Sequence, residues 1–188
     1  MKIRAFKQKL SLIHLVSTIN AASNGLSGSL PAEIGLLSSL QYLDVTDNSL
    51  RGPIPSELGQ ISTLQNLYLV FNGLTGMLPT QLGNLSSLEE LNLSNNKLTG
   101  PIPSELGQAS NLLNMHLDSN TLSGTLPTQL GTLLSLQELV LSNNKLTGPI
   151  PSELGQLPDL YLMDLSGNAG LTGPVPPEID QLRFFVVL

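Results

Sequence analysis

An asparagine recurs every 24 residues along most of this chain, and this period limits the possible folds more than any other feature. The series is Asn24, Asn48, Asn72, Asn96, Asn120, Asn144 and Asn168. The phrase LSNNKLTGPIPSELGQ stands at 93–108 and again, unchanged, at 141–156, which indicates duplication of a two-repeat block. A fixed period of this length predicts an array in which each repeat is one structural unit.

Each unit also carries apolar residues at seven fixed distances from its asparagine. In the unit from Asn72 these residues are Leu74, Leu78, Leu82, Leu85, Leu88, Leu91 and Leu93. The alternation at the last two predicts a short strand with one buried face. Gly76 and Pro79 have counterparts in the other units, and they predict turns and exclude a continuous helix.

One such unit is too small to fold alone. About seven inward side chains at ~2 kcal/mol each do not offset an ordering cost of ~1.5 kcal/mol for every residue of the unit. Stacking buries each leucine row against its neighbours, so we expect a solenoid whose stability depends on the number of repeats. The asparagine both donates and accepts hydrogen bonds, and we expect it to satisfy backbone groups at a turn between coils.

The segment Asn96 to Pro103, followed by Leu106 and Gly107, resembles the plant-type leucine-rich repeat, whose consensus contains LxGxIPxxLGxLxxLxxLxLxxN. The resemblance covers residues 24–188. It implies an α/β solenoid: a right-handed superhelix with a parallel β-sheet on its concave face, and often a second short strand around LxGxIP. Such repeats are typical of receptor-like kinase ectodomains, receptor-like proteins and polygalacturonase-inhibitor-like proteins. The cysteine-paired caps usual in those ectodomains cannot form here, because the chain has no cysteine.

The period divides the chain into three parts. Residues 1–23 fit the apolar register but lack its proline and glycine, which indicates a degenerate repeat or cap; their basic, apolar and small residues also allow a signal-like segment. Residues 24–167 form six complete repeats. Residues 168–188 form a partial seventh with a one-residue insertion near Ala169. Its last apolar row predicts an open edge through which copies self-associate, or a longer protein of which this is a piece.

The charge and the hydropathy of the chain argue against a nucleic-acid partner and against a membrane span. The net charge is -6, but four of the eight basic residues lie within the first nine positions, so the remaining chain carries 14 acids against four bases. This acidic body repels phosphate, and we expect no nucleic-acid partner. The chain has no run of 18 apolar residues, so we expect no membrane span within it.

We expect no catalytic, cofactor or metal site, and no enzyme activity. His14 and His116 fall about four coils apart, and the adjacent Glu89 and Glu90 should point to different sides of a strand. The chain has no thiolate, and every glycine is explained by the repeat, so no phosphate-binding loop is predicted.

The repeats differ most at the outward positions of the predicted concave strands. An aromatic and acidic cluster lies there, and exposed aromatic side chains beside carboxylates are typical anchors of a protein interface. The alternative for Phe71 is that its ring turns inward and stacks on the coil. The predicted partner-binding residues are Tyr42, Asp44, Tyr68, Val70, Phe71, Glu90, His116, Glu138 and Asp164.

These features favour a non-catalytic module that recognises a protein or peptide, within a receptor-like or secreted protein. The resemblance implies an extracellular or cell-surface location, and the Asn84-Leu85-Ser86 and Asn92-Leu93-Ser94 sequons permit glycosylation. A cytoplasmic scaffold would carry the same repeats. A binder of ice or polysaccharide is the third alternative, because an outward column of hydroxyl residues, interrupted by Arg51, is formed by Ser27, Thr75, Thr99, Ser123, Thr147 and Thr172.

Overall fold

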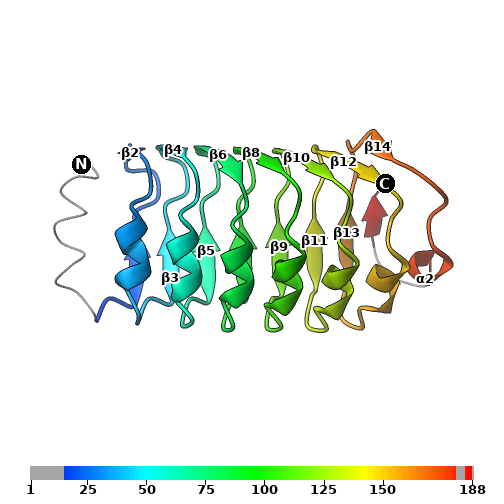
Figure 1. Cartoon of the computed structure of the whole chain (residues 1–188), viewed down its shortest axis with the longest axis horizontal. Coiled ribbons are helices and arrows are strands. Elements are labelled where there is room, and N and C mark those ends of the chain that lie inside the picture. Colours follow the sequence, from blue (N-terminus) through cyan, green and yellow to red (C-terminus); the bar gives the residue numbers. More distant parts are fainter. Residues whose placement is uncertain (1–14, 181–184, 188) are drawn as a thin grey trace.

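The computed structural model describes residues 15–180 and 185–187, and it is a solenoid of stacked coils that follow one another in sequence order along the long axis (Figure 1). Each regular coil contributes one strand to each of two parallel sheets and one short helix. Among the described residues the two sheets have eight and seven strands, and in both the strands lie in chain order. The predicted solenoid, with its second short strand in each repeat, is therefore confirmed.

The eight-stranded sheet, called the main sheet below, is formed by the LxL segments. Its strands are β1 (Thr18–Asn20), β3 (Tyr42–Asp44), β5 (Asn66–Tyr68), β7 (Glu90–Asn92), β9 (Asn114–His116), β11 (Glu138–Val140), β13 (Leu162–Asp164) and β15 (Phe185–Val187). The pairing advances by one repeat at each regular step, so Leu43 lies beside Leu67 and Leu67 beside Leu91. From β3 to β13 the central residue is buried and its two neighbours are partly exposed, as the alternation predicts.

The seven-stranded sheet, called the side sheet below, begins two residues or fewer after most of the asparagines. Its strands are β2 (Ser27–Gly28), β4 (Ser49–Gly52), β6 (Gly73–Met77), β8 (Lys97–Gly100), β10 (Thr121–Gly124), β12 (Lys145–Gly148) and β14 (Gly170–Leu171). The glycine that ends β4, β8, β10 and β12 has a positive φ, 76° at Gly100, which an L side chain adopts only with strain. This requirement explains why the repeat keeps a glycine there.

The helical segments are short 3-10 helices that stack in a row along the solenoid (Figure 1). They are η1 (Ala32–Leu36), η2 (Ser56–Gln60), η3 (Thr80–Asn84), η4 (Ser104–Gln108), η5 (Thr128–Thr132) and η6 (Ser152–Gln156), and the short α2 (Pro177–Asp180) follows in the last coil. A proline precedes each 3-10 helix and starts the turn, as at Pro103 with φ -64°. A Cβ at Gly83 would lie 2.0 Å from the Glu105 carbonyl oxygen of the next coil, so only glycine allows the helices to pack this closely.

The core is one continuous column of leucine side chains that runs through all coils. The seven apolar positions of each complete repeat are buried, with Leu26 and Ile150 partly buried at the two ends. Leu67, Leu91 and Leu139, at the centres of their strands, have at most 1% of their surface exposed. Each leucine packs against its equivalents above and below, so the coils stabilise one another rather than themselves.

The recurring asparagines form a ladder of hydrogen bonds between coils, which confirms their predicted role. Asn120 Nδ2 donates to the carbonyl oxygens of Leu117 and Asp118 in its own coil and of Leu93 in the preceding coil, at 3.1 Å each. Its Oδ1 accepts from the Leu98 amide at 3.0 Å. The same pattern recurs from Asn48 to Asn168.

Neighbouring asparagines also share acceptors. The Leu117 carbonyl accepts from Asn120 at 3.1 Å and from Asn144 at 3.0 Å. Both lone pairs of that oxygen are used, so each buried carbonyl joins two successive rungs.

No helix in the described residues is long and apolar enough to cross a membrane. The signal-like segment and most of the predicted first repeat lie outside the described residues. The side chains at 182, 185 and 188, which form the predicted open edge, are also outside them. The boundaries 1–23, 24–167 and 168–188 remain a prediction.

We expect Asn120→Ala to lower the free energy of unfolding by about 2 kcal/mol or more, because it leaves the buried Leu98 amide without an acceptor and removes the Nδ2 group from which three backbone carbonyls accept hydrogen bonds. Asn24→Ala is the matched control. Asn24 is exposed, and within residues 15–180 its side chain donates only to the Ala22 carbonyl, at 2.7 Å, so this variant should lose under about 0.5 kcal/mol. Urea unfolding followed by circular dichroism measures both, and equal losses would contradict the ladder.

Candidate recognition surface

The outward face of the main sheet holds seven of the nine predicted binding residues on its strands. They flank the buried central residues and are partly exposed: Tyr42, Asp44, Tyr68, Glu90, His116, Glu138 and Asp164. Val70 and Phe71 follow β5, and lie at the edge of the same face. The parallel register therefore brings the seven strand residues, which come from six repeats of sequence, onto one surface. Their role in binding remains a prediction.

An aromatic pair lies near the N-terminal end of this surface. The ring centroids of Tyr42 and Tyr68 are 5.6 Å apart with an interplanar angle of 57°, because the register places Tyr68 beside Asp44 and so diagonal to Tyr42. The Tyr42 hydroxyl donates to Asp44 Oδ2 at 3.3 Å. Asn66 Nδ2 donates to the Tyr68 hydroxyl at 3.4 Å. The pair is thus held in place by neighbours before any ligand binds.

The protonation of the aromatic pair follows from its surroundings. Burial raises the pKa of Tyr68, and the nearby carboxylates of Glu90 and Asp44 raise it further. Burial and the Asp44 carboxylate also raise the pKa of Tyr42. Both phenols therefore stay neutral at physiological pH and present hydroxyl groups beside negative charge.

Phe71 is exposed, so the alternative in which its ring packs inward is wrong. Its side chain is 56% exposed, and its backbone is left-handed with φ 50°. The other residues at this position of the coil that share this conformation are Ser23, Asp47, Asn95, Ser119 and Asn143, which are small or form local hydrogen bonds easily. A bulky residue with positive φ is strained, and strain of this kind concentrates at functional sites.

A polar chain of contacts occupies the C-terminal half of the surface. His116 Nε2 lies 2.8 Å from Glu138 Oε2, and His116 Nδ1 lies 3.4 Å from Asn92 Nδ2. Tyr161, one residue before β13, donates its hydroxyl to Glu138, and this bond raises the pKa of Tyr161. Sequence reasoning missed Tyr161. The sequence did contain a signal, because Tyr161 is aromatic and the residues at the same position of the preceding coils are not. The equivalent residues of the preceding coils are Gln41, Gln65, Glu89, Leu113 and Gln137.

Hydrogen bonds order two further polar residues of the face. Burial alone would raise the pKa of Asp164, but hydrogen bonds from the Ser166 hydroxyl and amide and from Ser142 outweigh it and lower the pKa. Glu90 Oε1 accepts from Asn114 Nδ2 at 2.7 Å. Asp164 is therefore ionised at physiological pH.

Charge is segregated between the two sheets. The face of the main sheet carries carboxylates at Asp44, Glu90, Asp118, Glu138 and Asp164. The three Lys and Arg residues within 15–180 are Arg51, Lys97 and Lys145, and all three lie on strands of the side sheet. Within the same range no group of three His, Asp or Glu side chains is arranged to hold a metal ion.

The hydroxyl column lies on the side sheet, but it does not form a regular row across the strands. Pairing in this sheet is shifted, so Thr75 lies beside Lys97 and Ser123 beside Lys145. Thr99 lies between Met77 and Thr121. Met77 is a large exposed apolar side chain. The expected array of hydroxyl groups is therefore interrupted by lysine and methionine as well as by Arg51.

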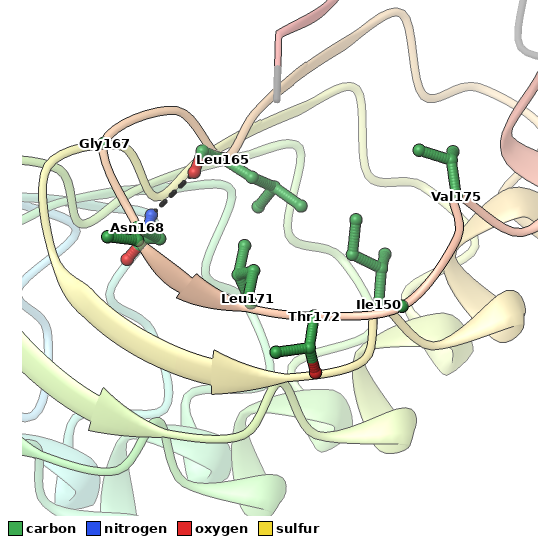
Figure 2. A pocket seen from close by; sticks show the side chains of 9 residues that line it. Ile150, Leu165, Gly167, Asn168, Leu171, Thr172 and Val175 are labelled. Carbon is green, nitrogen blue, oxygen red and sulfur yellow. Dashed lines mark hydrogen bonds between the residues drawn. The ribbon is translucent and has the colours of Figure 1, made fainter.

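A separate apolar cavity of about 480 Å³ lies near the C-terminal end of the solenoid. Figure 2 shows Ile150, Leu165 and Leu171 lining one space, with Val175 beside it. The insertion near Ala169 forms an extra turn, in which the Leu171 amide donates to the Asn168 carbonyl at 3.0 Å. The cavity lies beside this extra turn, and self-association at this end of the solenoid remains a prediction.

We expect Phe71→Asn to raise the free energy of unfolding by about 1 kcal/mol, because asparagine adopts the left-handed conformation with less strain and already occupies this position at Asn95 and Asn143. Phe71→Val, which is β-branched, should give no such gain. Urea denaturation of the three proteins measures the difference. A destabilised Phe71→Asn protein would mean that the ring contributes packing to the coil.

Comparison with known sequences gives family matches over most of the chain. Residues 19–125 match a family described as a leucine-rich repeat region, and residues 110–169 match one described as a leucine rich repeat. Comparison with curated proteins gives no match.

Solved structures with the same fold include plant receptor ectodomains. The crystal structure of a TDR receptor is 33% identical, with a TM-score of 0.91 over 95% of this chain and 31% of that one. The ectodomain of the Arabidopsis receptor kinase HAESA, in complex with an extended IDA peptide hormone, is 34% identical with a TM-score of 0.89 over 93% and 29%. A plant ice-binding protein is 28% identical with a TM-score of 0.66 over 90% and 61%. The chain thus spans about a third of the receptor ectodomains.

Proposed function

The chain belongs to the leucine-rich-repeat family, and we propose that it is a non-catalytic module that binds a peptide or protein through the outward face of its main sheet. The observation that carries the proposal is the composition of that face. It combines exposed aromatic side chains with five carboxylates, and the described residues place no lysine or arginine on it. A negatively charged face with aromatic anchors fits a partner of basic or mixed charge.

The dimensions of the face fit an extended peptide. The seven strands from β1 to β13 are about 4.8 Å apart, which gives a face about 29 Å long across the strands. An extended chain advances about 3.3 Å per residue, so about nine residues of ligand cover it. Glu90 and Glu138 lie two strands apart, which is about one turn of a polyproline-II peptide. Such a peptide would present basic side chains to both carboxylates.

The solved structures that resemble the chain support this mode of recognition, because they include receptor-kinase ectodomains and the HAESA ectodomain is in complex with a peptide hormone. We propose by this likeness a receptor-like or secreted protein at the cell surface or outside the cell. Asn84, exposed at the end of η3, would be an accessible glycan site in that compartment. A cytoplasmic scaffold would lack such a glycan, and secretion of the tagged chain with mass analysis of Asn84 distinguishes the two.

We expect the double variant Tyr68→Ala with Phe71→Ala to weaken binding by about 2 kcal/mol or more if these rings are anchors. The matched control is Glu57→Ala with Glu105→Ala, which removes two carboxylates on η2 and η4 and should change binding by under about 0.5 kcal/mol. The ligand is selected from secreted peptides and measured by calorimetry at low and high salt, with circular dichroism to confirm folding. Higher salt should weaken association. A loss caused by the control pair alone would contradict the proposed face.

The ice or polysaccharide alternative rests on the hydroxyl column and on the likeness to the plant ice-binding protein. We expect no inhibition of ice-crystal growth, because Lys97 and Lys145 interrupt the lateral rows of hydroxyl groups. Microscopy of growing ice crystals checks this. Inhibition that is abolished by Thr99→Asp, but retained in Tyr68→Ala, would favour the alternative over peptide recognition.

A further inference from the structure

We propose that Asn24 is a site of spontaneous deamidation in the folded protein, whereas Asn72 is protected from the same reaction by the asparagine ladder. Both residues occupy the same position of their repeats, and both are followed by glycine. Glycine offers no side chain to hinder the approach of its backbone nitrogen to the asparagine side chain. The local sequence is therefore equally permissive at 24 and 72, and the fold decides which of the two reacts.

Asn24 is the first of the recurring asparagines, and the described residues hold its side chain weakly. Its side chain is exposed, and among the described residues its Nδ2 donates only to the Ala22 carbonyl, at 2.7 Å. Gly25 has φ 63°, and no atom lies within 4 Å of where its Cβ would be. Water and the Gly25 nitrogen can both reach the side-chain amide carbon, Cγ, after one solvent-exposed hydrogen bond breaks.

Asn72 has the opposite environment. Its Nδ2 donates to the carbonyls of Val45 at 3.0 Å, Leu69 at 3.2 Å and Val70 at 3.1 Å, and its Oδ1 accepts from the Leu50 amide at 3.0 Å. Gly73 is part of β6 and pairs with Arg51 of β4. Rotation of the Asn72 side chain toward the Gly73 nitrogen would break these bonds together and disturb two coils.

The reaction needs only water and a base. The Gly25 backbone nitrogen loses its proton to solvent base and attacks Asn24 Cγ, the Cγ–Nδ2 bond breaks, and ammonia leaves with a proton from water. The product is a five-membered succinimide. Water then opens either ring carbonyl, which gives aspartate or isoaspartate at position 24. Because the first step removes the amide proton, the rate rises with pH.

The reaction would change the first rung of the ladder. The backbone amides of Asn24 and Leu26 donate to Asn48 Oδ1 at 3.2 and 2.7 Å, and isoaspartate adds a methylene to the main chain between them. The new carboxylate also lies one residue from Ser23, whose hydroxyl donates to Asp47 at 2.8 Å. The product is a substrate for the class of methyltransferase that acts on isoaspartyl carboxylates.

The test incubates the full chain at mildly alkaline pH and quantifies deamidation at both sites by peptide mapping with fragmentation, and isoaspartate by methyltransferase labelling. We expect Asn24 to react about tenfold faster than Asn72 or more, since the barrier at Asn72 includes several lost hydrogen bonds. In concentrated guanidinium chloride the two deamidation rates should become similar, because unfolding removes the hydrogen bonds that protect Asn72. Asn24→Gln should abolish most labelling of the native protein.

Equal rates in the native protein would overturn the proposal. A difference that persists unchanged in the unfolded chain would also overturn it, because the protection would then come from sequence rather than from the ladder. The test is independent of any binding partner.

Discussion

The solenoid depends on the hydrogen bonds of its recurring asparagines. From Asn72 to Asn168, each of these side chains donates to three backbone carbonyls and accepts from one backbone amide. A turn between two strands leaves backbone groups unpaired, and burial of such groups is costly. Asn96 satisfies those of its own turn and of the coil before it, with donor distances of 2.9 to 3.2 Å. Because every rung must meet the next, the ladder fixes the length of the coil. The insertion near Ala169 adds an extra turn where the regular array ends, and the terminal cavity lies beside it.

This fixed frame leaves the outward positions of the main sheet free to vary. The leucine, asparagine, glycine and proline positions carry the stability, so a change at Tyr42 or His116 alters the surface without removing a core contact. Phe71 does not fit this division between structural positions and freely varying positions. It lies at the edge of the face, but at a position where the backbone favours asparagine or glycine. The structure therefore carries strain at one point of the face, next to the aromatic pair and its carboxylates.

Much of this arrangement follows from sequence, since strand positions, buried leucines and the role of Asn120 all depend on offsets that repeat within one coil. Contacts that depend on how one coil is placed against the next could not be predicted from the sequence. The pairing of Thr75 with Lys97 is an example, because the side sheet is staggered while the main sheet is aligned. The contact of Tyr161 with Glu138 is another, since it joins neighbouring coils. Contacts between coils depend on the lateral shift of one strand against the next, and the period of the sequence does not determine that shift.

The acidic face also raises the question of how one sheet tolerates five carboxylates when none of its described residues is a lysine or an arginine. The order of residues across the strands gives a physical answer. In the column that contains Glu90 and Glu138, Asn114 separates the two acids and donates to Glu90 at 2.7 Å. Like charges directly opposite each other destabilise a sheet, and a two-strand separation of about 9.6 Å is close to the distance at which salt screens exposed charges. Duplication of a two-repeat block produces this alternation, because it places equivalent acids in every second coil. In this column the chain thus carries two acids with little repulsion between adjacent strands.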